Sequence, residues 1–413
     1  MQTNLADFIR DTPEGKEADA ILRKCTHCGM CTATCPTYQL LNDELDGPRG
    51  RIYLIKQVLE GVTPSQKTQL HLDRCLTCLS CETTCPTGVR YGRLVDIGRK
   101  LVEERVERGP MEAAWRRVLN AVIPSGTRFG PLLKLGQMTR PLLPRALKRK
   151  IPPSTAPAGT WPAATHSRRM LVLEGCAQPS LSPATNAAAA RVLDRLGITL
   201  VRAVGAGCCG AVRFHLNEQD AAREQMRRNI DAWWPHVEAG AEAIVMTASG
   251  CGVTVKDYGH ALAHDPAYAE KAKRISALTK DISEIIAAEG EKLKPLIPPP
   301  SSLIRERRVA FHSPCSLQHG LKLKGQVESL LAALGYSLTD VPDAHLCCGS
   351  AGTYSILQPE LSQKLQANKI AALESGKPDV ILTANIGCQA HLQAATDLPV
   401  RHWIEALDEL LAR

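Results

Sequence analysis

The sequence predicts an α+β multidomain protein, in which a mostly helical N-terminal domain precedes two α/β domains related by pseudo-twofold symmetry. Eight of the sixteen cysteines lie in two short runs near the N terminus, and the other eight fall in an internal repeat. The 413 residues are enough for two or three domains. The expected parts are an N-terminal domain, a helical and then proline-rich basic linker, a first α/β domain, a short linker and a second α/β domain, at 1–109, 110–168, 169–293, 294–303 and 304–413.

The two N-terminal runs share one cysteine spacing, C-x2-C-x2-C-x3-C-P. The first contains Cys25, Cys28, Cys31 and Cys35, and the second contains Cys75, Cys78, Cys81 and Cys85. This is the ligand pattern of a two-cluster bacterial ferredoxin, in which the fourth cysteine of each run binds the other cluster. The pattern therefore predicts a ferredoxin-type domain with two [4Fe-4S] clusters and crossed ligand sets, namely Cys25, Cys28, Cys31 and Cys85 for one and Cys75, Cys78, Cys81 and Cys35 for the other.

Zinc and disulfides are the alternative interpretations of these cysteines. Structural zinc sites usually take two cysteines from each of two separated pairs, whereas three cysteines at three-residue intervals occur here twice. Disulfides require an oxidising compartment, and the first twenty residues, MQTNLADFIRDTPEGKEADA, have neither an apolar core nor a basic leader. We therefore expect reduced, metal-binding cysteines and a cytoplasmic location.

Composition and charge narrow the classes of partner. No apolar run approaches the roughly 18 residues of a membrane-spanning helix, and the mean hydropathy is slightly negative at -0.13. The formal net charge of +8 would suit an acidic partner or an anionic bilayer surface. No basic stripe with interleaved aromatic residues accompanies this charge, so we expect no nucleic-acid binding.

The other eight cysteines form the internal repeat. The position numbers of Cys176 and Cys315 differ by 139, as do those of Cys208 and Cys347, and those of Cys251 and Cys388 differ by 137. Each repeat also contains an adjacent pair followed by glycine. The two sets are Cys176, Cys208, Cys209 and Cys251, and Cys315, Cys347, Cys348 and Cys388.

The sequence around these cysteines alternates between strand and helix patterns in both repeats. Short apolar runs end at each cysteine position, and helical runs connect them. Helical crossovers make the strands parallel, and ligands of parallel sheets bind outside the carboxyl ends of the strands. We therefore expect the four thiols of each repeat to converge on a redox or metal site, with the glycine allowing a positive φ or a close approach. The expected segments, in each of which a strand runs into its cysteine or cysteine pair, are 169–176, 198–210 and 241–251 in the first repeat and 308–315, 336–349 and 378–388 in the second.

The segment between the N-terminal domain and the repeats mixes basic and apolar residues. Leu132, Leu133 and Leu135 interleave with basic residues, a composition suited to an anionic bilayer surface. Pro131, Pro141 and Pro144 should break any long amphipathic helix here, and a solvated basic linker is the alternative. The basic residues are Lys134, Arg140, Arg145, Lys148, Arg149 and Lys150.

Taken together, these motifs resemble the iron-sulfur subunit of glycolate oxidase, a glycolate dehydrogenase. The resemblance is carried by KCTHCGMCTATCPTYQLLNDELDGPRGRIYLIKQVLEG and HLDRCLTCLSCETTCPTGVRYGRLVDIGR, followed by the two Cys-Cys-Gly repeats, and it covers essentially the whole chain. The iron-sulfur subunits of lactate and anaerobic glycerol-3-phosphate dehydrogenases have a similar layout. The segment Asp46-Gly47-Pro48-Arg49-Gly50-Arg51 favours the glycolate enzyme.

The resemblance implies an electron-transfer subunit of an oxidoreductase acting on a CH-OH group. A partner flavoprotein subunit would oxidise the 2-hydroxy acid, and this chain would pass electrons on to an acceptor such as quinone. The chain would then need no flavin or NAD of its own and no catalytic residues for the hydroxy acid. Its eight N-terminal cysteines would hold the clusters, and the eight C-terminal cysteines would form further redox or metal sites, with the membrane surface as a further partner.

A rival hypothesis makes this chain a thiol or disulfide reductase, because the Cys-Cys-Gly repeats also resemble the catalytic subunit of heterodisulfide reductase. The full motif of that family ends in C-x2-C and gives five cysteines per domain. Here Gly250-Cys251-Gly252 and Gly387-Cys388-Gln389 leave four in each repeat. Disulfide reduction is therefore the weaker interpretation.

Overall fold

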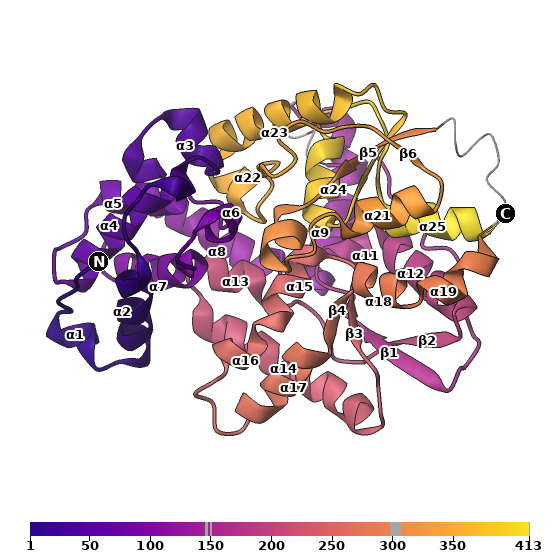
Figure 1. Cartoon of the computed structure of the whole chain (residues 1–413), viewed down its shortest axis with the longest axis horizontal. Helices are drawn as coiled ribbons and strands as arrows, with labels where there is room; N and C mark the ends of the chain where they lie inside the picture. Colours follow the sequence, from indigo (N-terminus) through magenta and orange to yellow (C-terminus); the bar gives the residue numbers. More distant parts are fainter. Residues whose placement is uncertain (145–147, 149–150, 298–306, 413) are drawn as a thin grey trace. The chain divides into compact units, whose positions relative to one another are not determined.

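The structure is a computed structural model that describes residues 1–144, 148, 151–297 and 307–412 (Figure 1). Residues 298–303 of the expected short linker, and Arg145, Arg149 and Lys150 of the basic linker, lie outside the described residues. The chain forms two compact units, Met1–Arg117 with His345–Lys369 and Val118–Ala344 with Ile370–Arg413. The second Cys-Cys-Gly turn, at 347–349, therefore belongs to the same unit as the N-terminal cysteine runs.

The first unit is mostly helical, as the sequence predicts. Its core is formed mainly by α4 and α7, which contribute Ile55, Leu59, Leu94 and Val95, all fully or almost fully buried. The elements are α1 (Asp7–Arg10), α2 (Pro13–Lys24), η1 (Met30–Thr32), α3 (Pro36–Leu41), η2 (Glu44–Asp46), α4 (Pro48–Leu59), α5 (Gln66–Asp73), α6 (Ser80–Thr84), α7 (Tyr91–Glu103) and α22 (Tyr354–Leu357). The helix α8 (Pro110–Val122) follows α7, and α23 (Pro359–Glu374) follows α22.

Helix ends place the N-terminal cysteines. The helix α2 ends at Lys24, so Cys25 is its C-cap residue, and α3 begins at Pro36, so Cys35 is its N-cap residue. Proline suits the first position of a helix because its nitrogen has no hydrogen to leave unpaired and its φ is already helical. In the first run the proline thus starts a new helix directly after the fourth cysteine, whereas in the second run Pro86 lies in a turn and the next helix begins at Tyr91.

The second unit contains two four-stranded parallel sheets, one per repeat. Their strand orders are equivalent, β2-β1-β3-β4 and β6-β5-β7-β8. In the first sheet Leu171 pairs with Val201 on one side and with Ile244 on the other, and in the second sheet Val309 pairs with Leu338 and Val380. The strands are β1 (Arg168–Val172), β2 (Ile198–Arg202), β3 (Ile244–Met246), β4 (Thr279–Asp281), β5 (Arg308–His312), β6 (Ser337–Leu338), β7 (Val380–Thr383) and β8 (Val400–His402).

Helices connect and cover the strands of both sheets (Figure 1). The helix α12 of the first repeat packs on α25 of the second, and Leu193, Ile198, Trp403 and Leu407 belong to the hydrophobic core that the repeats share. The helical elements are α9 (Gly126–Thr139), η3 (Arg140–Leu142), α11 (Gln178–Leu181), α12 (Pro183–Arg195), α13 (Ala211–His215), α14 (Gln219–Glu238), α15 (Ser249–Lys256), α16 (Tyr258–Ala261), α17 (Ala269–Leu278), α18 (Ile282–Ala288), α19 (Gly290–Leu293), η4 (Lys294–Leu296), the π-helix η5 (Ser316–Gly320), α21 (Gln326–Ala333), α24 (Ile386–Gln393) and α25 (Trp403–Leu411).

The structure departs from the sequence-based prediction in the basic linker. Pro131 lies inside α9 rather than ending it. The hydrogen bond that proline cannot make would go to the carbonyl of Thr127, which lies in the exposed first turn, where water can replace it. The helix ends at Thr139, just before Pro141. Among the described residues, no helix is both long enough and apolar enough to cross a membrane.

Candidate iron-sulfur and cysteine-rich sites

The eight N-terminal cysteines line two neighbouring cavities in the first unit. Cys25, Cys28 and Cys31 line the first cavity together with Cys85 from the second run. Cys75 and Cys78 line the second cavity together with Cys35 from the first run. Cys81 lines both cavities. The fourth cysteine of each run thus lies beside the first three of the other run.

The two cysteine loops share an unusual backbone conformation. His27 and Gly29 have φ angles of 60° and 85°, and Thr77 and Leu79, at the equivalent positions, have φ angles of 52° and 62°. Leu79 adopts this left-handed conformation without the freedom of glycine, at a cost of about 1 kcal/mol. Two left-handed residues between three cysteines curl each loop around its cavity.

Hydrogen-bond donors surround the cysteine sulfurs. The backbone N–H groups of Thr77 and Val89 donate to Cys75 Sγ and Cys85 Sγ at 3.4 and 3.5 Å. The hydroxyls of Thr37 and Thr87 lie 3.3 and 3.4 Å from Cys35 Sγ and Cys85 Sγ. Sequence reasoning missed both threonines, although the repeated Cys-Pro-Thr of the two runs was the signal.

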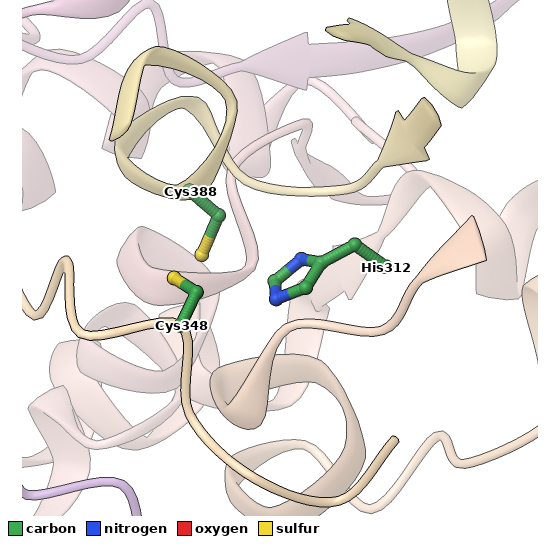
Figure 2. A group of neighbouring side chains, drawn as sticks. All are labelled: His312, Cys348 and Cys388. Atoms are coloured by element: carbon green, nitrogen blue, oxygen red, sulfur yellow. The ribbon is translucent and has the colours of Figure 1, made fainter. Parts of the chain in front are cut away.

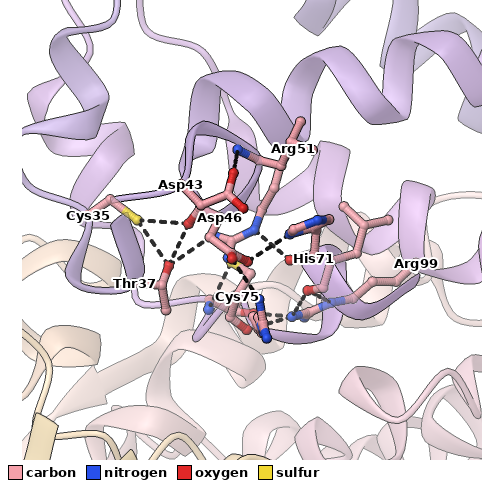
Figure 3. A network of polar contacts seen from close by, with 12 residues as sticks. Cys35, Thr37, Asp43, Asp46, Arg51, His71, Cys75 and Arg99 are labelled. Carbon is pink, nitrogen blue, oxygen red and sulfur yellow. Dashed lines mark hydrogen bonds and ion pairs between the residues drawn. The ribbon is translucent and has the colours of Figure 1, made fainter. Parts of the chain in front are cut away.

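Two buried arginines lie at the second cavity: Arg51 lines it, and Arg99 hydrogen-bonds to two of its lining residues, Cys75 and Thr77 (Figure 3). Arg51, on α4, is 1% exposed and donates to the carbonyl oxygen of His71, to Thr37 Oγ1 and to Asp46 Oδ1. Arg99, on α7, donates to the carbonyl oxygens of Leu72 and Cys75 and to Thr77 Oγ1. These contacts fix two positive charges beside the second set of cysteines.

The arginines change the acidity of the second set. Burial alone would raise the pKa of the Cys75 thiol, but the guanidinium groups of Arg51 and Arg99 lower it below its ordinary value. Tyr91 adds to this effect by donating its hydroxyl to Cys75 Sγ at 3.6 Å. In the first cavity, burial raises the pKa of Cys31 to about 11. The surroundings of Cys75 thus favour its thiolate form, whereas the thiolate form of Cys31 needs a metal ion to stabilise it.

The two cavities fit [4Fe-4S] clusters. Such clusters bind four cysteine thiolates and are tuned by hydrogen bonds to sulfur, by nearby charge and by exposure to solvent. Five cysteines line the first cavity and four line the second, with Cys81 common to both, and each cavity also has apolar side chains such as Ile52 or Leu76 and donors directed at sulfur. Burial and, to a smaller degree, the neighbouring thiols raise the pKa of Cys81, and a cluster of positive irons would stabilise its thiolate.

In the first repeat, the four predicted cysteines form a connected group after the ends of the strands. Cys208 lies within hydrogen-bonding reach of Cys176 and Cys209, and Cys209 lies within reach of Cys251. Hydrogen bonds from Cys176 and Cys209 lower the pKa of Cys208 to about 4, while the pKa of each donor is raised. The group can therefore hold at least one thiolate at neutral pH, as a metal ligand or as a redox thiol.

Two residues that the sequence analysis did not single out hold the Cys208-Cys209 turn. Asn229, on α14, accepts from the N–H of Gly207 at 2.8 Å and donates to the carbonyl oxygen of Cys208 at 2.9 Å. It also donates to the hydroxyl of Tyr258, which donates to the carbonyl oxygen of Cys209 at 2.8 Å. Asn229 is 1% exposed, and a polar residue on an otherwise apolar helix face was the available signal.

The glycine after each cysteine pair has the predicted positive φ, 96° at Gly210 and 88° at Gly349. The N–H of Gly210 points to Cys208 Sγ at 3.5 Å, and that of Gly349 points to Cys347 Sγ at 3.4 Å. A Cβ atom at position 349 would lie 2.6 Å from the carbonyl oxygen of Ser362. Glycine is therefore needed here both for its conformation and for the close approach of α23.

The second repeat's cysteines belong to different units of the structure. Cys347 and Cys348 lie in the segment His345–Lys369 of the first unit, whereas Cys315 and Cys388 lie in the second. Within the second unit, His312 at the end of β5 and Cys388 on α24 have ligand atoms within 4.8 Å of each other. Figure 2 draws these two side chains together with that of Cys348. His312 therefore adds an imidazole nitrogen to the donors of this repeat.

Asn385 connects the two repeats beside their cysteines. Its Nδ2 donates to Cys388 Sγ at 3.4 Å, and its Oδ1 accepts from the N–H of Gly250 at 3.2 Å. Gly250 directly precedes Cys251 of the first repeat. One side chain thus contacts the last cysteine of one repeat and the residue before the last cysteine of the other.

The fold and the sites define a cysteine-rich iron-sulfur protein with a helical two-cluster domain and two α/β cysteine-rich domains. Comparison with protein families agrees with this description. Residues 21–89 match the 4Fe-4S dicluster domain, and residues 170–256 and 309–393 match the cysteine-rich domain. Two [4Fe-4S] clusters are therefore the cofactors of the N-terminal domain.

Curated relatives resemble the chain, one of them over its full length. It is 56% identical to the glycolate oxidase iron-sulfur subunit of Escherichia coli K12, with 100% of both chains covered. It is 28% identical to the probable glycolate oxidase iron-sulfur subunit of Bacillus subtilis 168, over 89% of this chain and 87% of that one. Lactate utilization protein A of Bacillus licheniformis is 27% identical, over 49% of this chain and 80% of that protein. The chain belongs to the family of glycolate oxidase iron-sulfur subunits.

Proposed function

We propose that this chain is the electron-transfer subunit of an enzyme that oxidises glycolate to glyoxylate. A flavoprotein subunit would oxidise the substrate, and this chain would carry the electrons to an acceptor, for which quinone is our candidate. The observation that carries the proposal is the 56% identity, over the whole of both chains, to an iron-sulfur subunit of glycolate oxidase. Lactate is the second candidate substrate, but the lactate-utilisation relative covers 49% of the chain.

We assign the ligands of the two clusters according to the cavities that the cysteines line. Cys25, Cys28, Cys31 and Cys85 would hold one cluster, and Cys75, Cys78, Cys81 and Cys35 would hold the other. A bound [4Fe-4S] cluster accepts and releases electrons one at a time, which lets a two-electron flavin feed a chain of carriers. The protein's part is to bind the irons through thiolates, to direct N–H and O–H donors at the sulfurs and to keep bulk water away from the buried second cavity.

The exposures of the cysteines suggest where electrons enter. Cys28 is exposed, and Cys31 and Cys85 are half-buried, so the first cavity is the more open one. Cys35, Cys75 and Cys81 of the second cavity are buried. We propose that a partner subunit delivers electrons at the first cavity, because a carrier near the surface can be approached closely by another protein.

We propose that the C-terminal cysteines form further redox or metal sites. In the first repeat, four thiols linked in a row, one of them with a pKa of about 4, provide thiolate ligands at neutral pH. A disulfide reductase would need a thiolate that its substrate can reach. Cys176 and Cys251 are half-buried, but Cys208, the thiol with the lowered pKa, is 7% exposed, and its neighbour Cys209 is 3% exposed. Metal ligation therefore fits this group better than thiol exchange. We also propose 1–109, 110–168, 169–293, 294–303 and 304–413 as the functional domains and linkers.

Glycolate oxidation can be tested on the complex isolated from the source cells. The tagged chain is purified anaerobically, and its visible cluster absorption is recorded before and after addition of glycolate. We expect a flavoprotein to copurify and glycolate to bleach the absorption, whereas D-lactate and glycerol 3-phosphate should bleach it little. Cys28→Ser and Cys78→Ser should retain the flavoprotein but lose acceptor reduction. Bleaching by lactate alone would overturn the substrate assignment, and bleaching by dithionite alone would overturn the partnership.

We further propose that α9 and η3 rest on the anionic inner face of the cytoplasmic membrane. None of the fourteen residues of α9 is buried. Leu132, Leu135, Met138 and Leu142 are 49%, 55%, 80% and 87% exposed. Residues 126–142 contain three basic residues, Arg128, Lys134 and Arg140, and no acidic residue. Exposed apolar side chains whose charged neighbours are all basic suit an anionic bilayer better than a neutral surface.

Vesicle binding tests this surface. The full chain is sedimented with vesicles of phosphatidylcholine alone and with vesicles that contain phosphatidylglycerol. We expect binding to the anionic vesicles that weakens at least fivefold in Leu135→Asp and in Lys134→Glu. Lys273→Glu, on the exposed face of α17, is the matched control and should bind as the unmodified chain does. Equal binding to both kinds of vesicle, or no binding to either, would reject the proposal.

A further inference from the structure

We propose that Arg51 sets the reduction potential of the cluster held by Cys75, Cys78, Cys81 and Cys35, and makes that cluster the stronger electron acceptor of the two. Asp46 acts as the opposing charge that holds Arg51 in place. Both are positioning residues, because they act on the cluster through space and through Thr37. The inference rests on the proposed function and on its ligand assignment.

The position of Arg51 is fixed from several sides. It lies in the first turn of α4 and borders the second cavity. Its Nε donates to the carbonyl oxygen of His71 at 2.7 Å, and its Nη1 donates to Thr37 Oγ1 at 3.2 Å. The same Thr37 hydroxyl lies 3.3 Å from Cys35 Sγ. A single hydroxyl therefore separates the guanidinium group from a predicted ligand of the cluster (Figure 3).

The charges around this cavity do not cancel. The fully buried carboxylate of Asp46 is shared by Arg51 at 3.4 Å, Arg74 at 2.8 Å and the imidazole of His71 at 3.1 Å. Arg99, also buried, makes its hydrogen bonds to carbonyl oxygens and a hydroxyl, which are neutral acceptors. A second carboxylate, that of the exposed Asp43, has an oxygen within 4.8 Å of ligand atoms of Asp46 and His71. Three arginines thus stand against two carboxylates, of which only Asp46 is buried, and the surplus is positive.

A surplus positive charge favours the reduced cluster. Each added electron makes a thiolate-bound cluster more negative, so a buried cation stabilises the reduced form more than the oxidised form. Burial in apolar surroundings acts in the opposite direction, because it disfavours the more highly charged form.

The first cavity has no equivalent buried cation among its lining residues. Its arginine is Arg49, whose side chain is 36% exposed and paired with Glu44 at 2.5 Å. An exposed, neutralised guanidinium group is screened by water and contributes little. The two cavities therefore differ in charge although their cysteine motifs are identical in spacing.

This difference in charge would direct the electron from the cluster of the first cavity to the cluster of the second cavity. The cluster near Arg51 also lies on the side of Tyr354, a 6% exposed tyrosine that follows the second Cys-Cys-Gly turn. Burial raises the pKa of Tyr354, and the charges of Arg51, Cys75 and Cys347 all act on it, so it lies near all three. The cluster with the higher potential is thus the one whose residues Arg51 and Cys75 share Tyr354 as a neighbour with Cys347.

The experiment measures the two cluster potentials directly. The full chain is reconstituted anaerobically with iron and sulfide, and a potentiometric titration is followed by electron paramagnetic resonance without glycolate or partner. In Arg51→Gln we expect one of the two midpoint potentials, the higher one, to move to a lower value while the other stays unchanged. In Arg51→Lys, which keeps the positive charge, this midpoint potential should stay close to that of the unmodified chain. Arg49→Gln is the matched control and should leave both potentials unchanged.

A second variant covers the case in which Arg51→Gln fails to fold. Asp46→Asn keeps one acceptor oxygen, which can take the hydrogen bond of Arg51 but not that of Arg74 as well, and it removes the negative charge, so the same midpoint should move to a higher value. Unchanged potentials in Asp46→Asn and Arg51→Gln, or equal shifts of both clusters, would overturn the inference and leave the proposed function standing. A chain that binds no [4Fe-4S] cluster would instead overturn the ligand assignment itself.

Discussion

The imidazole of His402, in the last strand of the second sheet, donates a hydrogen bond from Nε2 to the carbonyl oxygen of Thr247, after the third strand of the first sheet, at 2.8 Å. Its Nδ1 accepts from the N–H of Ile404 at 3.2 Å and so caps α25. Both ring nitrogens are therefore used by the neutral imidazole. This contact joins the two pseudo-symmetric repeats at a point where protonation would break the cap.

The first prediction concerns the pH dependence of stability. Burial lowers the pKa of His402 from 6.5 to about 4. Because the unfolded chain takes up the proton first, His402 contributes stability above pH 6.5 that is lost as the pH falls toward 4, on the order of 3 kcal/mol in total. Urea unfolding of the full chain followed by circular dichroism at pH 7.5, 6 and 5 should show this loss. His402→Gln should have a flatter profile, and the exposed His264→Gln should keep the original one; parallel profiles in all three chains would refute the assignment.

The second prediction concerns the crossed ligand sets. Cys85 lies in the first cavity and Cys35 in the second, although the sequence places each in the other run. We expect Cys85→Ser to disturb the same cluster signal as Cys28→Ser, and Cys35→Ser to disturb the same signal as Cys78→Ser. Each variant should lose up to about four irons per chain, since each cubane has four. Electron paramagnetic resonance of the reduced chain identifies the altered cluster.

The control in this experiment is which two serine variants disturb the same cluster signal. If Cys85→Ser matched Cys78→Ser instead, the ligand sets would be uncrossed and each run would hold its own cluster. Thr26→Ala, which borders the first cavity but offers no sulfur, should leave both signals in place. A loss of both clusters in Thr26→Ala would mean that iron content reports folding rather than ligation.

The helical first domain and the parallel sheets of the repeats were predictable because their signals are local. A short apolar run predicts β1, and a helical pattern later in the same repeat predicts α12. The strands β4 and β8 were not predicted, since each has three residues with a polar residue at its centre, Lys280 or Arg401. Three-residue strands at a sheet edge leave almost no periodic signal.

The candidate site was predictable only where its residues share a motif. The cysteine spacing alone places Cys85 with the first run, because the pattern is known for two-cluster proteins. Arg51, Asp46 and Asn385 carry no such pattern, since their roles arise when distant segments meet in the fold. Even so, the Asp46–Arg51 segment had been singled out by the family resemblance, and the structure gives it a physical role beside Cys35 and Cys75.

The third prediction concerns the glycine of the second cysteine pair. Gly349 has a φ of 88°, and a Cβ atom there would approach Ser362 O at 2.6 Å and Leu365 Cβ at 2.9 Å. Gly349→Ala should therefore lower the free energy of unfolding by about 2 to 4 kcal/mol, through both strain and overpacking. Gly352→Ala is the matched control, because Gly352 has a φ of 61° but no atom within 4 Å of its Cβ position. It should cost about 1 to 2 kcal/mol.

Urea unfolding of the two alanine variants separates the two costs. The difference between them measures the close approach of α23 to the turn, because both share the conformational penalty. Equal losses would mean that α23 yields to the extra methyl group without cost. The iron content of both variants should stay near that of the unmodified chain, since neither residue borders a cluster cavity.

The fourth prediction concerns the turn that carries Cys208 and Cys209. Asn229→Leu removes the acceptor for Gly207 N and the donors to Cys208 O and Tyr258. Buried groups left without partners cost about 1 to 3 kcal/mol each, so we expect a loss of about 2 to 4 kcal/mol in the free energy of unfolding. The freed turn should also expose the thiols, so that a thiol reagent modifies Cys208 and Cys209 faster than in the unmodified chain.

Arg228→Leu is the matched control for the Asn229 variant. Arg228 is the preceding residue of α14, its side chain is 63% exposed, and the same leucine is introduced into the same helix. A surface change of this kind should alter stability by no more than about 0.5 kcal/mol and leave thiol reactivity unchanged. If Asn229→Leu behaved like Arg228→Leu in both measurements, the hydrogen bonds of Asn229 would not be what holds the cysteine pair. Faster thiol modification without loss of stability would place the effect of Asn229 on the turn alone.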